Sequence, residues 1–295
     1  MRVFVTGATG FIGSAVVKEL MNAGYEVLGL ARSQVGVKSL IEMGAQVHRG
    51  DIEDLDSLRR GAAMSDGVIH LAFNHDFSKF QENCETDRRV IETLSSPLMG
   101  TDRPLVVTSG VAILPPGQLG TEDTLTTSGA AAHPRTASEE AADLAAERGV
   151  HVSVVRLAPS VHGDGRYGFV SLLIDLARNQ GVSAFVGEGL NRWPAVHRLD
   201  AARLFKLAFE KGVAGARYHG VDEEGVPLRE IAEVIGHRLN VPIVSKTPEE
   251  ANHHFGWFSP FAMMDILSSS QKTRDQLGWQ PIQAGLIQDL GQSLY

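Results

Sequence analysis

The chain begins with Met1-Arg-Val-Phe-Val-Thr-Gly-Ala-Thr-Gly-Phe-Ile-Gly13, and this stretch decides the fold. The apolar triplet Val-Phe-Val predicts a short buried strand, and the apolar periodicity after the last glycines predicts a helix. Gly7, Gly10 and Gly13 are spaced three residues apart between these elements. Such glycines allow a tight turn, let backbone N–H groups approach a pyrophosphate, and let the helix pack closely on the strand. The stretch predicts a dinucleotide-binding turn, with a plain strand–helix turn as the alternative.

The composition is that of an ordinary globular protein. Of 295 residues, 43% are hydrophobic and 21% are charged, and the net charge of −8 argues against a nucleic-acid partner. Cys84 is the single cysteine, which excludes an internal disulfide and favours a reducing, cytoplasmic setting. No apolar run approaches the roughly 20 residues of a membrane span, and the N-terminal strand leaves no room for a signal peptide. We expect a soluble cytoplasmic protein with no membrane partner.

Strand and helix patterns alternate through the first half of the chain, which predicts a parallel sheet with crossover helices. Further strands are expected at residues 25–31, 46–49, 67–71, 104–108 and 152–157, and helices at residues 35–43, 55–63, 79–98 and 134–148. The fold class is α/β, a Rossmann-type doubly wound sheet. Residues 1–160 are the expected dinucleotide-binding domain, and residues 161–295 are the expected smaller, discontinuous substrate-binding part. In that part we expect helices at 169–179, 201–211 and 228–239 and short strands at 183–186, 216–219 and 242–244.

With these elements in place, the chain resembles the extended, epimerase/dehydratase-like branch of the short-chain dehydrogenase/reductase superfamily along essentially its whole length. The resemblance is carried by residues 6–13, 50–52, 70–72, 107–109, 156–163 and 196–200. It implies a bound nicotinamide dinucleotide. The implied contacts are Gly7, Thr9, Gly10, Phe11, Ile12 and Gly13 at the pyrophosphate, Asp51 and Ile52 at the adenine, Leu71, Ala72, Phe73 and Thr108 along the dinucleotide, and Pro159, Ser160 and Val161 at the nicotinamide.

The end of the second strand bears on which dinucleotide is bound. An NAD-selective site places a carboxylate there to accept hydrogen bonds from the ribose hydroxyls. This chain has Arg32 and Ser33 instead. A guanidinium and a hydroxyl suit the 2′-phosphate of NADP. We expect NADP, with NAD and a merely solvated arginine as the alternatives.

The usual catalytic residues of that superfamily are absent. Its tyrosine and lysine, four residues apart on one helix, align with His133 and Ala137, and its serine aligns with Gly110. None of the four tyrosines is followed four residues later by lysine. The resemblance is therefore to an atypical member of the superfamily.

His133 is the first candidate to replace the missing tyrosine. Pro134 suits the first turn of a helix, so His133 would lie at the helix N-terminus, where the dipole disfavours the imidazolium. A neutral imidazole there can donate a hydrogen bond to a carbonyl or act as a base. Thr108 and Ser109 are the accompanying catalytic candidates. A capping or surface histidine is the alternative, and Arg135 is expected to be solvated.

Five residues are candidates for substrate contact. Asn74 and His75 follow the fourth strand, at the sheet edge where ligands bind in open α/β folds. His162 follows the segment expected beside the nicotinamide, and Arg192 and Trp193 begin the closing part of the chain. Solvated loop residues and, for Trp193, core packing are the alternatives. No metal site is expected, because the adjacent His253 and His254 lack a ligand spacing.

These observations favour an NAD(P)-dependent oxidoreductase acting on a small-molecule ketone or alcohol. A non-redox enzyme (isomerase, dehydratase or cyclase) on the same fold is the first alternative, because the tyrosine and lysine are missing. A non-catalytic, NADP-binding sensor is the second. The alanine-rich face of residues 134–148 suits packing on the sheet or in a homodimer.

Overall fold

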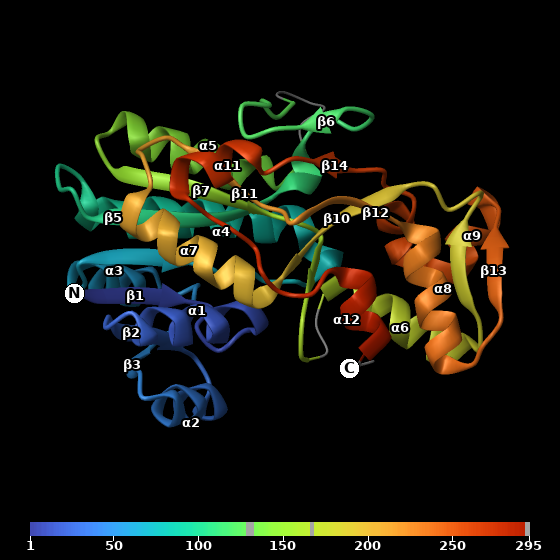
Figure 1. Cartoon of the computed structure of the whole chain (residues 1–295). Coiled ribbons are helices and arrows are strands. Elements are labelled where there is room, and N and C mark those ends of the chain that lie inside the picture. Colours follow the sequence, from blue (N-terminus) through green and yellow to red (C-terminus); the bar gives the residue numbers. More distant parts are fainter. Residues whose placement is uncertain (128–132, 166–167, 293–295) are drawn as a thin grey trace.

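The computed structural model describes residues 1–127, 133–165 and 168–292. Its larger part is a seven-stranded, wholly parallel sheet in the order β11-β7-β5-β4-β1-β2-β3 (Figure 1). The strands are β1 (Arg2–Thr6), β2 (Glu26–Ala31), β3 (Gln46–Arg49), β4 (Gly67–His70), β5 (Pro104–Gly110), β7 (His151–Leu157) and β11 (Arg217–Gly220). The chain order reverses beside β1, so the expected doubly wound sheet is confirmed.

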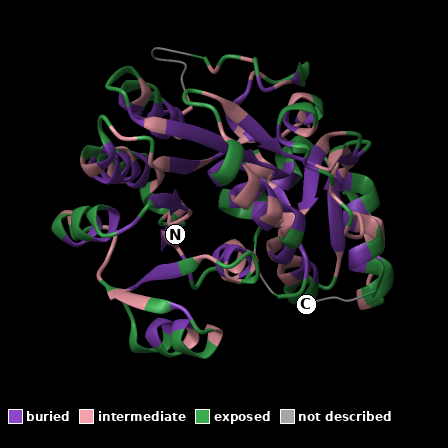
Figure 2. Ribbon diagram, turned by 60° about the vertical axis from the view of Figure 1, so that its left-hand side comes forward, coloured by how far each residue is buried: buried purple, intermediate pink, exposed green. Residues whose placement is uncertain are grey.

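Helices cover both faces of the sheet. Successive side chains of β1 point to opposite faces, and both faces of this strand carry apolar side chains that need to be covered. Val3 and Val5 lie in one core cluster and Phe4 in the other. The first cluster includes residues of α1 (Phe11–Asn22), α2 (Gln34–Met43) and α7 (Arg198–Lys211). The second includes residues of α3 (Leu55–Ala63), α4 (Phe80–Ser95) and α5 (Thr136–Glu147). In Figure 2 the buried strands lie between helices whose outer faces are exposed. The alanine face of α5 is thus covered within the chain.

A smaller lobe packs around a third core cluster. Its sheets are β12-β10-β8, β13-β9 and β14-β6. The bounds of its elements are β6 (Leu119–Gly120), β8 (Ser160–His162), α6 (Gly168–Gln180), β9 (Ser183–Val186), β10 (Arg192–His197), β12 (Glu223–Pro227), α8 (Leu228–Leu239), β13 (Ile243–Lys246), α9 (Pro248–Phe255), α10 (Ser259–Ala262), β14 (Leu267–Ser268) and α12 (Leu286–Gln292). Between β14 and α12 the chain forms α11 (Gln271–Leu277), which packs on α7 and β11 of the large sheet.

The lobes do not divide at residue 160. The expected strand at 216–219 is β11, which hydrogen bonds to β7 as the edge of the large sheet rather than joining the smaller part. Leu204 and Phe205 of α7 pack in the core cluster of α1. The chain therefore enters the small lobe after β7 and returns to the large sheet through α7 and β11. It then enters the small lobe a second time.

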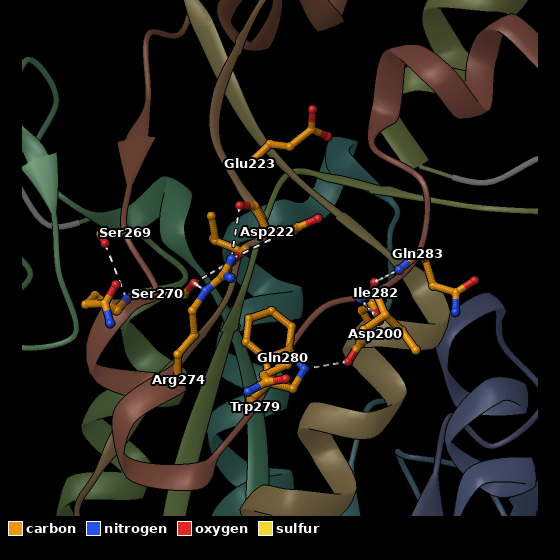
Figure 3. Close-up of polar contacts among 12 residues, drawn as sticks. Asp200, Asp222, Glu223, Ser269, Ser270, Arg274, Trp279, Gln280, Ile282 and Gln283 are labelled. Atoms are coloured by element: carbon orange, nitrogen blue, oxygen red, sulfur yellow. Dashed lines mark hydrogen bonds and ion pairs between the residues drawn. The ribbon is translucent and has the colours of Figure 1, made fainter.

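A buried carboxylate fastens the C-terminal segment to this junction (Figure 3). Asp200 at the start of α7 is fully buried, and its oxygens accept from the backbone N–H groups of Ile282 at 3.1 Å and Gln283 at 3.0 Å. The Trp279 indole donates to the Asp200 carbonyl at 3.0 Å. Asp200 is therefore a structural residue. Across the described residues, we find no helix with the length and apolarity needed to cross a bilayer.

Candidate functional site

The glycine turn has no room for larger side chains. A Cβ on Gly7, whose φ is +65°, would lie 2.7 Å from the backbone nitrogen of Ala72, and a Cβ on Gly13 would lie 1.9 Å from the Gly7 carbonyl oxygen. Gly10 is the N-cap of α1 and offers no side-chain acceptor to the first-turn N–H groups, so a phosphate can take that role. These observations fit a dinucleotide pyrophosphate, held by the turn through Thr9–Gly13. Arg198 of α7 adds a guanidinium 4.9 Å from the centroid of the Phe11 ring.

The expected adenine end lies beside the ends of β2 and β3. Arg32 is largely exposed and lies 3.8 Å from the Asp51 carboxylate. Arg49, paired with Ala31 in the sheet register, brings a second guanidinium, which donates to Gln34 at 2.7 Å. The Ser33 hydroxyl caps α2 by accepting from the Gly36 N–H. Ile52 packs against the second core cluster.

A buried polar network joins three strand ends. The Thr6 hydroxyl accepts from the N–H groups of Leu71 and Ala72 and lies 2.6 Å from His70 Nδ1. His70 Nε2 lies 3.0 Å from Asp87 Oδ1. Thr108 donates to the His70 carbonyl at 2.7 Å. The network thus fixes the backbone that is expected to lie along the dinucleotide.

Arg135 completes this network, so the expectation that this side chain is solvated is wrong. Its guanidinium contacts Asp87 Oδ2 at 2.5 Å and the Thr108 carbonyl at 3.0 Å, and its Cζ lies 4.1 Å above the centroid of the Phe73 ring. Ser138 also donates to Asp87 at 2.6 Å. Burial alone would raise the pKa of Asp87, but Arg135 and His70 hold that pKa well below its usual range. No sequence signal links Arg135 to Asp87, because the pair depends on α4 and α5 packing together.

His133 lies immediately before the helical turn that leads into α5. Its Nδ1 accepts a hydrogen bond from the Arg135 backbone N–H at 3.2 Å. In a neutral imidazole this assigns the ring proton to Nε2. Burial and the positive charge of Arg135 both lower the pKa of His133. The ring is therefore a neutral N–H donor, and it packs edge-on against Phe80 with centroids 5.5 Å apart.

The other two catalytic candidates, Thr108 and Ser109, differ in exposure and in the contacts of their hydroxyl groups. Thr108 is partly exposed, although its hydroxyl is engaged with His70. Ser109 is 5% exposed, and its Oγ is buried without a hydrogen-bond partner among the described residues. Of the two hydroxyls, only that of Thr108 is joined to the network at the strand ends.

The substrate candidates separate into exposed and buried residues. Asn74 and His75 are exposed beside Phe73, with the His75 and Phe73 ring centroids 5.3 Å apart. Trp193 is 1% exposed and packs with Phe258 in the core of the small lobe, so its expected substrate contact is replaced by core packing.

Arg192 and His162 also have protein partners. Arg192 is held by both oxygens of Asp265, at 2.9 and 2.8 Å. His162 Nδ1 lies 2.8 Å from Asp289. Pro159 and Val161 are partly exposed, whereas Ser160 Oγ and His162 Nε2 are buried and have no hydrogen-bond partner among the described residues.

Sequence reasoning missed Phe80, which packs against His133, and its neighbour Phe77. Phe77 of a short 3₁₀ helix (Phe77–Lys79) and Phe80 at the start of α4 connect the sheet edge to the small lobe. Phe77 stacks on Trp257 with centroids 5.1 Å apart. The density of phenylalanine in residues 73–80 was the available signal.

Comparisons with known proteins identify the family and the fold of the chain. The family model described as NAD dependent epimerase/dehydratase family matches residues 3–221. An uncharacterised protein of Schizosaccharomyces pombe is 49% identical over all of both chains. The 2-alkyl-3-oxoalkanoate reductase of Stenotrophomonas maltophilia is 28% identical over 83% of this chain and 78% of its own.

A solved structure supports the fold. The dTDP-glucose 4,6-dehydratase DesIV of Streptomyces venezuelae, with NAD and TYD bound, superposes with a TM-score of 0.78 at 21% identity, covering 99% of this chain and 95% of its own. At that identity the likeness speaks for the fold alone. Together with the family match, it shows that this chain is a member of the NAD dependent epimerase/dehydratase family.

Proposed function

We propose that the protein is an NADP-dependent oxidoreductase that interconverts a ketone and an alcohol in a small organic molecule. The observation that carries the proposal is the neutral His133 N–H donor, held at the sheet edge by Arg135, which contacts the end of β5. A relative of known activity, the 2-alkyl-3-oxoalkanoate reductase, supports reduction of a carbonyl group.

A bound reduced nicotinamide would supply the hydride that converts the carbonyl carbon to an alcohol carbon. The residues of this chain would manage the oxygen. His133 Nε2–H donates a hydrogen bond to the carbonyl oxygen and stabilises the negative charge that develops there. A neutral imidazole is too weak an acid to give up this proton fully, so solvent water protonates the oxygen. Burial and the charge of Arg135 lower the pKa of His133 and favour its neutral form, and the Arg135 backbone N–H holds its tautomer.

The proposed preference for NADP over NAD rests on the residues at the ends of β2 and β3. Arg32 and Arg49 both bring guanidinium groups to this place, and guanidinium groups bind phosphate in bidentate fashion. The Ser33 hydroxyl accepts from Gly36 and still has its own proton to donate. These groups favour the 2′-phosphate over a free ribose hydroxyl.

Calorimetry with NADPH and NADH tests the cofactor. We expect both to bind, NADPH more tightly, and the Arg32→Ala variant to lose most of that difference. Absence of binding by either dinucleotide would overturn the proposal.

Turnover with a panel of carbonyl compounds tests the reaction. The His133→Ala variant should be slower by about 10²- to 10⁴-fold, the usual contribution of one proton-handling group. His133→Gln, which keeps an N–H donor, should be less impaired, and His237→Ala, at an exposed position on α8, should match the wild type. Product formation without a change in nicotinamide absorbance would instead show non-redox chemistry.

A further inference from the structure

A continuous series of aromatic rings runs from His133 to the small lobe. The His133 and Phe80 ring centroids are 5.5 Å apart, and Phe80 stacks on Phe77 at 5.6 Å. Phe77 in turn lies 5.1 Å from Trp257 and 5.5 Å from Phe261. The series begins at the proposed hydrogen-bond donor and ends on the segment 257–264. We call these four rings, Phe77, Phe80, Trp257 and Phe261, the aromatic wall.

The aromatic wall is not part of the closed core. Trp257 is 56% exposed, and the other three rings are partly exposed. Behind them Trp193 and Phe258 are each 1% exposed and supply the packing of the small lobe. An exposed apolar surface of this kind marks a place where another apolar group binds.

A cavity of about 310 Å³ lies beside the same segment. One side is formed by Ala112 and residues 114–116, which follow β5, and the other by Pro260 and residues 263–267. Leu114, Pro116, Pro260 and Met263 are among its apolar lining residues. The volume is at the lower end of the ~300–1,000 Å³ range of small-molecule sites, so it suits a compact ligand.

Two charged groups beside these surfaces, Asp265 and Arg135, are already paired. Among the described residues that line the cavity, Asp265 alone carries a charge, and both its oxygens are held by Arg192. Arg135, which lies over Phe73, is paired with Asp87. Recognition of a diphosphate would require breaking one of these pairs, whereas an apolar molecule leaves both intact.

We propose that the substrate is a compact, uncharged carbonyl compound with an aromatic or otherwise apolar body, which packs on the aromatic wall, with the cavity at the far side of the segment 257–264 as the space for a larger apolar group. The inference rests on the proposed function for its carbonyl group. It argues against a nucleoside-diphosphate sugar as the substrate, because the described lining of the cavity is apolar apart from Asp265 and the nearby guanidinium groups of Arg135 and Arg192 are paired.

Three probes test this proposal, with binding followed by tryptophan fluorescence in the presence of NADP. The neutral 1-phenyl-1,2-propanedione should bind and perturb the emission of Trp257. Phenylglyoxylate, which has the same ring and a carboxylate in place of the methyl ketone, should bind at least about tenfold more weakly, equivalent to about 1.4 kcal/mol. UDP-glucose should not compete.

Two variants distinguish loss of the proposed ring contact from a general loss of the folded structure. Trp257→Ala should weaken binding of the diketone by about tenfold, because a stacked ring is lost; since this variant lacks the fluorescent reporter, calorimetry measures its affinity and that of the wild type. In that variant, calorimetry should show unchanged NADPH binding. Val213→Ala, at an exposed apolar position after α7, should behave as the wild type.

Preferential binding of UDP-glucose, equal affinity for the two phenyl probes, or diketone binding that is insensitive to Trp257→Ala would each overturn the inference. Failure of the proposed function has a different signature, since it appears as absent dinucleotide binding or absent hydride transfer. The phenyl probes are scored by binding alone, so the two failures are distinguishable.

Discussion

At the scale of single residues, the Asp87–Arg135 pair is the interaction whose loss we expect to matter most. Both side chains are largely buried, at 3% and 13% exposure. Replacing one partner leaves the other charge buried without compensation, which typically costs about 3–5 kcal/mol. Asp87→Asn should therefore lower the free energy of unfolding at pH 7 by about 3 kcal/mol in urea denaturation.

The matched control is Asp56→Asn, which removes an exposed carboxylate paired with Arg59 and should change little. The pH dependence has a definite sign. Because the pKa of Asp87 is lowered, the ionised carboxylate stabilises the folded protein at neutral pH. This contribution to the free energy of unfolding is lost only as the pH falls below the ordinary carboxyl value of 3.8. Equal effects of the two variants at pH 7 would contradict the structural role of the pair.

The same residues show where sequence reasoning stops. The glycines of the turn could be assigned from the sequence, because their spacing reflects local backbone geometry. Arg135 and Asp87 could not, because they are 48 positions apart and meet only when α4 packs on α5. Ser33 was expected to face a phosphate, and its hydroxyl also serves as the cap of α2.

At the scale of elements, the packing of α1 on β1 depends on Gly13. A Cβ there would meet the Gly7 carbonyl oxygen at 1.9 Å and the Gly7 carbonyl carbon at 2.8 Å. These are backbone atoms, so the turn must open to admit Gly13→Ala. We expect the variant to lose NADPH binding by calorimetry and to be less stable by about 1–3 kcal/mol.

Gly291→Ala provides the comparison. This glycine lies in α12, and an added Cβ would meet nothing within 4 Å. Because alanine favours helix, the stability should stay the same or rise, and NADPH binding should be unchanged. Normal dinucleotide binding by Gly13→Ala would show that the turn does not hold the pyrophosphate as proposed.

Element boundaries were predictable where periodicity was strong. The helix expected at 228–239 is α8, with the same bounds. The helix expected from residue 134 begins at Thr136, because the His133 carbonyl and ring accept the first N–H groups in a tighter turn. The capping box of Thr247 and Glu250 was a readable signal for α9 that the sequence analysis missed.

At the scale of the whole molecule, the large sheet followed from alternating patterns, but the return of β11 to it did not. A strand of four residues carries no mark of the sheet that it joins. Its position is fixed by tertiary contacts, including those of His219. That residue is fully buried between the main sheet and the segment around Ser268, and it links the two lobes.

His219 makes stability depend on pH. Arg156 donates to its Nε2 at 3.4 Å, and its Nδ1 lies 2.8 Å from the Ser269 carbonyl, so the ring is neutral with the proton on Nδ1. Burial is the main reason that the pKa of His219 is lowered from 6.5 to about 4, opposed by Glu122 and Glu139 and reinforced by Arg156. Between these values the unfolded chain binds a proton that the folded chain does not. Stability should therefore fall as the pH drops from 6.5 to 4, by up to about 3 kcal/mol from this group.

His219→Asn tests this coupling because asparagine keeps an N–H donor but does not titrate. At pH 7 the variant should be less stable than the wild type, since it cannot reproduce both ring contacts. Towards pH 4 the two stabilities should converge, because only the wild type loses the contribution of a neutral buried imidazole. Urea denaturation across this pH range measures both curves. His162 and His197 also have pKa values lowered by burial and remain in both proteins, so convergence rather than a flat profile is the expected result. Parallel curves would mean that His219 does not titrate on unfolding in this range and that acid acts on the junction through other groups.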